Sequence, residues 1–332
     1  MRALVRRETG LVLERDYPMP APVDGEVLIR VLLAGICNTD LEIVHGYLSF
    51  QGVLGHEFVG VVQEIYGDVA QERYGHLVGK RVVGEINAAC HRPDCPSCQS
   101  GMPTHCPNRT TLGIVNRDGA FAEYLMLPVE NLHAVPDEVS DEEAVFIEPL
   151  AANFEIGEQV HLKPTDNVVI VGDGKMGQLA AQVLLLNGCT VSMVGKHKEK
   201  LALAEKQGVH PYLLDDTQDF TLEHGHHADV VVECSGSSQG LTLALRLIRP
   251  RGVVVLKTTT SNLSTLHLAP IVIDEIRVQG SRCGPFPPAI RALSQRTVDV
   301  LPLISARYSL DEGLDAFGHA GEKAVLKVLI RI

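Results

Sequence analysis

The hydrophobic positions change their spacing about halfway along the chain. Up to about residue 150 they form short apolar runs broken by Gly and Pro, such as "ALVRR", "GEVLIRVLLAGI", "FVGVVQEI", "KRVVGE" and "FAEYLML". No 3.6-residue period persists in this part, and short runs bounded by turn residues are typical of β-strands. The first part of the chain is therefore expected to form an irregular antiparallel β domain.

From about residue 153 onward, apolar strands alternate with helical segments. We expect strands at 168–171, 191–194, 229–233 and 253–256, and helices at 175–186, 198–208 and 239–248. Such alternation predicts an α/β fold with a doubly wound parallel sheet and helices on both faces. The alternation stops after about Cys283, and the terminal run "KAVLKVLI" is expected to return as a strand to the first domain.

The composition limits the partners and the compartment. The chain has 332 residues, 45% of them hydrophobic, and a formal net charge of −12. An acidic chain has no general attraction for nucleic acid or for anionic membranes, so neither is expected as a partner. The charged N-terminus "MRALVRRETGLVLERDYP" lacks the apolar core of a signal peptide, and no apolar run reaches the length of a membrane span. We expect a soluble cytoplasmic protein, in which clustered thiols indicate a metal site rather than disulfides.

Four of the eight cysteines lie in the segment at about 88–108, "AACHRPDCPSCQSGMPTHCP". They are Cys90, Cys95, Cys98 and Cys106, with the spacing C-x4-C-x2-C-x7-C. Four thiolates suit a closed tetrahedral zinc that leaves no position for a substrate. The segment therefore predicts a structural zinc lobe, with four unligated thiols as the alternative.

A glycine-rich loop follows the first strand of the second half. "VVIVGDGKMG" places Gly172, Gly174 and Gly177, with Lys175 and Met176 between them, between a strand and a helix. In that context the glycines predict a dinucleotide site with the pyrophosphate at the helix N-terminus. Hydroxyls and a glycine after later strands, at Ser235, Gly236 and Thr258, are expected either to line the cofactor or to be ordinary loop residues.

The end of the second strand bears on the choice between NAD and NADP. NAD binders usually place an acid there to bond the ribose hydroxyls. This chain has Gly195 followed by Lys196. We therefore expect NADP(H) rather than NAD(H), with Lys196 at the 2′-phosphate; the alternative is a surface lysine that opens a helix.

A second set of potential zinc ligands lies outside the cysteine-rich lobe. Cys37 stands in "GICNTD", and His56 and Glu57 stand in "GVLGHEFVG". Glu148 lies in the apolar run "FIEPLA", where a buried carboxylate is costly without a cation or a proton. Cys37, His56 and a carboxylate could hold one zinc and leave a position open for substrate.

These motifs, in this order over essentially the whole chain, resemble the zinc-dependent medium-chain alcohol dehydrogenases. The Glu-Pro segment at Glu148 resembles the polyol, sugar and threonine dehydrogenase branches. The resemblance implies a GroES-like catalytic domain at 1–152 plus 284–332, with a Rossmann domain inserted at 153–283. It also implies hydride transfer between an alcohol, polyol or sugar hydroxyl and the cofactor, and a homodimer or homotetramer.

The resemblance assigns roles residue by residue. Cys37, His56 and Glu148 would bind a catalytic zinc, and Glu57 would exchange with the third ligand or with water as the metal moves. Thr39 would pass the alcohol proton outward. Many relatives carry a His three residues later, where this chain has Glu42. That departure leaves the relay beyond Thr39 open.

The resemblance also raises alternatives. The lobe usually has the spacing C-x2-C-x2-C-x7-C, so either Cys90 reaches the second zinc through a longer loop or His91 replaces it. Two zinc ions per chain are expected. The competing functions are an NAD-dependent dehydrogenase of the threonine type, a non-catalytic zinc- and dinucleotide-binding protein, and a nucleic-acid-binding zinc ribbon. The net charge of −12 disfavours the zinc ribbon.

Overall fold

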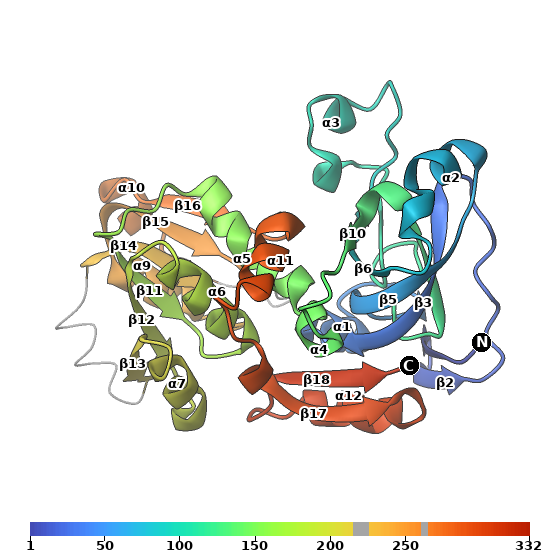
Figure 1. The fold of residues 1–332 in the computed structure, drawn as a ribbon. Helices are drawn as coiled ribbons and strands as arrows, with labels where there is room; N and C mark the ends of the chain where they lie inside the picture. Colours follow the sequence, from blue (N-terminus) through green and yellow to red (C-terminus); the bar gives the residue numbers. More distant parts are fainter. Residues whose placement is uncertain (215–225, 260–264) are drawn as a thin grey trace. The chain divides into compact units, whose positions relative to one another are not determined.

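The computed structural model describes residues 1–214, 226–259 and 265–332, and the remaining residues are drawn as a thin grey trace in Figure 1. The chain divides into two compact units. Unit 1 comprises Met1–Glu148, Ala289–Gln295 and Leu303–Ile332. Unit 2 comprises Pro149–Pro288 and Arg296–Pro302. The division falls between Glu148 and Pro149, inside helix α5 (Ile147–Gln159).

Unit 1 is built around a seven-stranded sheet with the order β10-β6-β5-β3-β18-β17, in which β9 also pairs with β3. The strands are β3 (Glu26–Gly35), β5 (Glu57–Ile65), β6 (Arg81–Gly84), β9 (Tyr124–Pro128), β10 (Leu132–Ala134), β17 (Ile304–Ser309) and β18 (Lys327–Arg331). All neighbours pair antiparallel except β17 and β18. The C-terminal strand β18 pairs with β3, so the tail completes a sheet formed by the first part of the chain.

Smaller elements surround this sheet. Strands β1 (Ala3–Arg7), β2 (Gly10–Glu14) and β4 (Gly52–Val53) form a second sheet, and β7 (Asn87–Ala88) pairs with β8 (Thr110–Thr111). The helices of this part of the chain are α1 (Asn38–Val44), α2 (Asp68–Tyr74), α3 (Pro96–Gln99), α4 (Asp141–Ala144), α11 (Phe286–Ser294) and α12 (Gly313–Ala320). The lobe with α3 projects from the strands of unit 1 (Figure 1).

Unit 2 contains a six-stranded parallel sheet with the order β13-β12-β11-β14-β15-β16. Its strands are β11 (Asn167–Val171), β12 (Thr190–Gly195), β13 (His210–Leu213), β14 (Ala228–Glu233), β15 (Ile248–Leu256) and β16 (Arg277–Gly280). Its helices include α6 (Lys175–Leu185), α7 (Lys198–Glu205), α9 (Gly240–Leu247) and α10 (Ala269–Ile273). The predicted parallel α/β sheet is confirmed.

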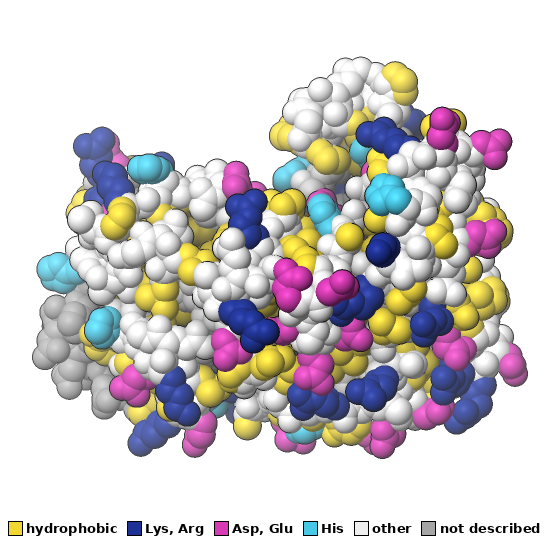
Figure 2. All heavy atoms as spheres, viewed as in Figure 1, with side chains coloured by type: hydrophobic (Ala, Val, Ile, Leu, Met, Phe, Trp, Pro, Cys, Tyr) yellow, Lys and Arg dark blue, Asp and Glu magenta, His cyan; other side chains and the backbone are white. Residues whose placement is uncertain are grey.

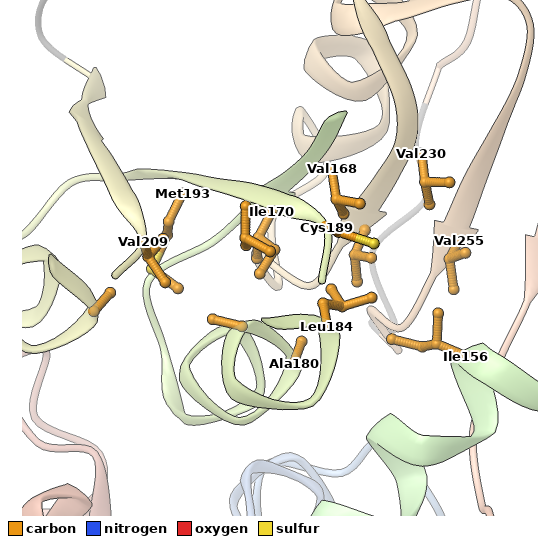
Figure 3. Packing of buried hydrophobic residues seen from close by; sticks show 14 of the residues in the cluster. Ile156, Val168, Ile170, Ala180, Leu184, Cys189, Met193, Val209, Val230 and Val255 are labelled. Atoms are coloured by element: carbon orange, nitrogen blue, oxygen red, sulfur yellow. The ribbon is translucent and has the colours of Figure 1, made fainter. Parts of the chain in front are cut away.

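Two apolar cores form on opposite faces of this sheet, because successive strand residues point to opposite sides. Val168 and Ile170 pack into one cluster with Leu184 of α6, shown in Figure 3, whereas Val169 and Val171 pack into the other. Both faces of β11 are buried, which explains its uninterrupted apolar sequence.

Several parts of the fold were not predicted, among them the short helices α1 to α4 of the first part of the chain. The edge strands β13 and β16 read "HPYL" and "RVQG", and neither is fully buried, so they lack the apolar run that marks a central strand. The tail after Cys283 also forms helices α11 and α12, although no helix was expected there. Helix α5 begins at Ile147, where its Glu-Pro sequence hid the helical period.

Within the described ranges, each helix is too short or too polar to cross a bilayer. On the face shown in Figure 2, Lys and Arg side chains are interspersed with Asp and Glu side chains, and no continuous basic stripe runs across it.

Candidate metal centre and dinucleotide site

The pairing of β3 with β5 places the first set of potential metal ligands together. The register sets Gly35 of β3 opposite Glu57 of β5. Cys37 follows β3 by two residues, and His56 immediately precedes β5. The ligand atoms of Cys37, His56 and Glu57 all lie within 4.8 Å of one another.

Asp40 holds this group in place, and sequence analysis did not single it out. Its side chain is fully buried. One carboxylate oxygen accepts the backbone N–H of Cys37 at 2.8 Å, and the other accepts that of Gly55 at 3.2 Å and lies 3.3 Å from His56 Nδ1. Cys37 and Asp40 form a capping box at the start of α1, so an acid three residues after the cysteine was the available signal.

Asp40 also sets the charge of the histidine. Burial alone would lower the pKa of His56, but the charges of Asp40 and Cys37 outweigh it and raise the pKa well above its usual value. A carboxylate behind a metal-binding imidazole fixes the ring orientation and makes it a better ligand.

Glu57 and Lys327 form an ion pair in the interior of unit 1. Both side chains are fully buried, and Lys327 Nζ contacts Glu57 Oε2 and lies 5.5 Å from the centroid of the Phe146 ring. The second carboxylate oxygen, Glu57 Oε1, is buried without a hydrogen-bond partner among the described residues. A buried carboxylate oxygen left in this state suits a metal ligand.

Glu148 lies beside this group without belonging to it. It opens helix α5, and its carboxylate is not among the three ligands within 4.8 Å. Burial raises the pKa of Glu148 to about 7, the charge of His56 lowers it, and that of Glu57 raises it. The charges of His56 and Glu57 therefore both act on the carboxyl group of Glu148. The donor set of thiol, imidazole and carboxylates fits zinc.

Thr39 and Glu42 both lie on α1, directly after Cys37. Thr39 Oγ1 accepts a weak hydrogen bond from Cys37 Sγ at 3.7 Å. Residues three apart on a helix share a face, so Glu42 lies on the side of Thr39. Both side chains are partly exposed, as a path that carries a proton outward requires.

The structure brings the four cysteines of the lobe together. The Sγ atoms of Cys90, Cys95, Cys98 and Cys106 lie within 4.8 Å of one another. Cys90 Sγ lies 3.4 Å from Cys106 Sγ, so the longer loop does reach the cluster. His91 instead pairs with Glu130 at 2.7 Å. The four-thiol set fits a tetrahedral zinc.

The glycine-rich loop has the geometry of a phosphate cradle. Gly172 adopts φ +123°, which L side chains rarely adopt, and a Cβ there would lie 2.8 Å from the carbonyl oxygen of Cys234. A Cβ at Gly177 would collide with the carbonyl oxygen of Gly172. A Cβ at Gly174 would meet no described atom within 4 Å. Space above Gly174, with Lys175 and Met176 opening α6, fits a pyrophosphate at the helix N-terminus.

The remaining predicted cofactor residues lie at the carboxyl ends of neighbouring strands. Ser235 follows β14 and donates to Glu233 at 2.6 Å, and Thr258 follows β15 and accepts the N–H of Gly236 at 3.0 Å. Gly195 ends β12, and the N–H of Lys196 donates to Asp173 of the glycine-rich loop at 2.7 Å. Asp173 is a further residue that sequence analysis did not single out.

The chain combines a parallel α/β unit that carries a glycine-rich loop with an irregular β unit that brings a cysteine, a histidine and a carboxylate together. This combination defines a zinc- and dinucleotide-binding oxidoreductase. Comparison with known proteins agrees. Residues 23–137 match the alcohol dehydrogenase GroES-like domain, and residues 176–299 match the zinc-binding dehydrogenase family. The chain belongs to the zinc-dependent medium-chain alcohol dehydrogenases, with a GroES-like domain and a Rossmann domain.

Three similar proteins span nearly its full length. Sorbitol dehydrogenase of Halalkalibacterium halodurans is 30% identical, over 99% of each chain. A zinc-binding dehydrogenase of Sinorhizobium meliloti 1021 bound to NADP is 29% identical, with a TM-score of 0.88 over 100% of this chain and 99% of the other. A structure described as a short chain alcohol dehydrogenase (rspB) of Escherichia coli CFT073, complexed with the cofactor NADH, is 27% identical, with a TM-score of 0.90 over the same shares.

Proposed function

We propose that this chain is a zinc-dependent dehydrogenase that transfers a hydride between an alcohol, polyol or sugar hydroxyl and a nicotinamide dinucleotide. The observation that carries the proposal is the convergence of the partly buried Cys37 with the buried His56 and Glu57, with Glu148 beside them. A scaffold that only bound a dinucleotide would not need a group of potential metal ligands of this kind. The sorbitol dehydrogenase relative supports a polyol as the substrate class.

In this proposal Cys37, His56 and Glu148 hold the catalytic zinc, and Glu57 is the ligand that exchanges with Glu148 or with water. Zinc, when bound, polarises the substrate hydroxyl and lowers its pKa. Asp40 orients His56, and Lys327 holds Glu57 through one oxygen, while the other oxygen has no hydrogen-bond partner among the described residues. Thr39 receives the hydroxyl proton and passes it along the exposed side of α1 toward Glu42.

The catalytic domain of the proposal comprises 1–152 plus 284–332, and the dinucleotide domain comprises 153–283. The two compact units support this division in outline, although residues 149–152, 284–288 and 296–302 group with unit 2. NADP(H) is the proposed preferred form, because Gly195 carries no acid and Lys196 supplies a cation. A second zinc in the four-cysteine lobe completes the proposed metal content, supported by the four clustered thiols.

Assembly and location are also part of the proposal. Among the described strands, β16 is an edge of its sheet; Val278 on β16 is 41% exposed, and Val272 and Ile273 of α10 are 74% and 77% exposed. An unpaired edge with exposed apolar side chains supports a homodimer or homotetramer. None of the eight cysteines, all of which lie in the described residues, forms a disulfide, and this supports a reducing compartment such as the cytoplasm.

A substrate panel tests the activity. The purified protein is assayed with alcohols, polyols, aldoses and threonine, each with NAD and with NADP. Turnover of a polyol or sugar supports the proposal, and turnover of threonine alone would favour an amino-alcohol dehydrogenase. A kcat/KM for NAD higher by more than about tenfold, which is ~1.4 kcal/mol, would refute the role given to Lys196.

Metal analysis with a matched variant separates an enzyme from a scaffold. Cys37→Ser is expected to remove one of two zinc ions and to abolish turnover, while Cys283→Ser, outside both clusters, retains both ions. Two zinc ions remaining in Cys37→Ser would show that the catalytic ligand assignment is wrong.

A further inference from the structure

The turn after β12 is filled by an acid from another part of the chain. Asp173 Oδ2 accepts the backbone N–H groups of Lys196 and His197, each at 2.7 Å. The imidazole Nδ1 of His197 lies 3.1 and 3.0 Å from the two carboxylate oxygens. Asp173 is 7% exposed, so this carboxylate is a built part of the turn rather than a surface acid.

Strand pairing explains why Asp173 reaches this position. β11 and β12 are parallel neighbours, and the N–H of Gly172 donates to the carbonyl of Val194 at 2.9 Å. A Cβ at Gly195 would lie 2.5 Å from Cβ of Asp173 and 2.7 Å from its carboxyl carbon. The Asp173 side chain therefore occupies the space that a side chain at the end of β12 would take.

The surrounding contacts fix the loop that carries Asp173. Gln178 is 2% exposed, and its Nε2 donates to the carbonyls of Asp173 at 3.3 Å and Lys200 at 2.8 Å. These bonds tie the glycine-rich loop to α7. The carboxylate cannot swing away from the turn without breaking its bonds to both backbone N–H groups.

An anion held by adjacent backbone N–H groups occupies the kind of concavity that binds phosphate. A second anion at the same turn would have to displace the carboxylate of Asp173 or bind close to it, where the two negative charges repel each other. In dinucleotide folds the end of the second strand is where the ribose 2′ position is recognised. Asp173 therefore stands where an NAD-type acid acts, although it comes from the glycine-rich loop.

We propose that Asp173 is a specificity-determining residue whose carboxylate repels the 2′-phosphate of NADP(H) at the turn where Lys196 attracts it. Asp173 thereby reduces the preference for NADP(H) over NAD(H). The inference rests on the proposed dinucleotide-dependent function. It predicts that the two residues act in opposite directions on one measurable ratio, Kd for NADH divided by Kd for NADPH.

Equilibrium binding tests this without relying on turnover. The zinc-loaded full-length protein is titrated with NADH and with NADPH, and nicotinamide fluorescence is recorded. Asp173→Asn keeps the shape and removes the charge, and it is expected to raise the ratio by about tenfold, or ~1.4 kcal/mol. Lys196→Gln is expected to lower it. Asp229→Asn, a carboxylate of the same sheet bonded to Asn167 and Arg249, is the matched control and leaves it unchanged.

The possible outcomes are distinguishable. A ratio in Asp173→Asn that stays at the wild-type value while NADH still binds overturns the role of Asp173. Binding of neither dinucleotide by the wild type rejects the proposed function instead. If Asp173→Asn does not fold, the same ratio of Kd values is measured in Asp173→Ser, which also lacks the charge. Competition by 5′-AMP and by adenosine 2′,5′-bisphosphate repeats the comparison with ligands that lack nicotinamide; a selective gain for the bisphosphate supports the inference, and equal changes refute it.

Discussion

Lys327 of the C-terminal strand neutralises Glu57 of the candidate metal centre inside a fully buried ion pair. The two residues are 270 positions apart, and β18 brings them together by pairing with β3, which in turn pairs with β5. Gly35 makes the approach possible, because a Cβ there would lie 2.8 Å from Glu57 Oε2 and 2.7 Å from Val145 Cγ1. The tail of the chain is thus part of the site.

Replacing Lys327 by Met is expected to lower the free energy of unfolding of the protein by about 3–5 kcal/mol, because it leaves a buried charge on Glu57 without a partner. Urea unfolding monitored by circular dichroism measures this. Arg331→Met, on the exposed end of the same strand, is the control and should change it by less than about 0.5 kcal/mol.

The double variant Lys327→Met/Glu57→Gln distinguishes an unpaired charge from lost packing. Removing both charges should recover much of the stability, since the cost comes mainly from the uncompensated carboxylate. Equal stabilities of the single and the double variant would show that packing dominates.

The four-cysteine lobe should depend on its metal for local structure. Cys95 is 2% exposed and Cys106 is fully buried, so the lobe has a small interior made largely of thiols. Cys95→Ser is expected to lose one zinc ion and to become sensitive to protease within 88–108, while the centre at Cys37 keeps its metal. Zinc content and the mapped cleavage sites measure both effects.

Loss of both zinc ions in Cys95→Ser would contradict two independent centres. Comparison with Cys90→Ser tests whether the longer loop supplies a ligand. Zinc that is retained in Cys90→Ser but lost in Cys95→Ser would exclude Cys90 as a ligand. His91 is paired with Glu130 and would have to leave that contact to replace it.

How far the sequence predicts this protein depends on how locally each feature is encoded. The glycine-rich loop lies in one run between a strand and a helix, and its context is enough to predict it. The roles of Asp40, Asp173 and Lys327 depend on which strands pair, and no local pattern reports strand order. Asp173 shows the limit well: its carboxylate accepts the N–H of Lys196, next to Gly195, although Asp173 stands 22 positions before Gly195 in the chain.

The pH dependence of stability should contain a contribution from Tyr17. Its hydroxyl donates to Asp118 at 2.8 Å, and burial together with this bond raises the pKa of Tyr17 to about 12. A raised pKa means that the folded protein favours the protonated phenol. The stabilisation is therefore complete below pH 10, the usual tyrosine value, and is lost as the pH rises toward 12.

Tyr17→Phe removes this contribution. The difference in unfolding free energy between wild type and Tyr17→Phe should be constant from pH 7 to about 9 and shrink above about pH 10. Urea unfolding at several pH values measures it, and titration of the 295 nm absorbance follows the phenol. A difference that stays constant up to pH 11 would mean that the Tyr17–Asp118 bond does not shift the titration.

Gly174 allows binding to be separated from folding. A Cβ at this position would meet nothing within 4 Å in the described structure, and its φ of −72° is open to any residue. Gly174→Val should therefore leave the melting temperature nearly unchanged. The side chain would instead enter the space above the loop and keep the pyrophosphate from the N-terminus of α6, so the Kd for NADH and NADPH should both rise by about tenfold or more.

Gly157→Ala is the control for Gly174→Val. It also has open space around its Cβ, but it lies inside helix α5, where Ala should stabilise by about 0.5–1 kcal/mol without changing the Kd. Gly177→Val, in contrast to Gly174→Val, should lower the melting temperature, because its side chain would collide with the carbonyl of Gly172 and disturb the packing of α6. Unchanged dinucleotide binding in a folded Gly174→Val protein would place the pyrophosphate elsewhere and refute the cradle.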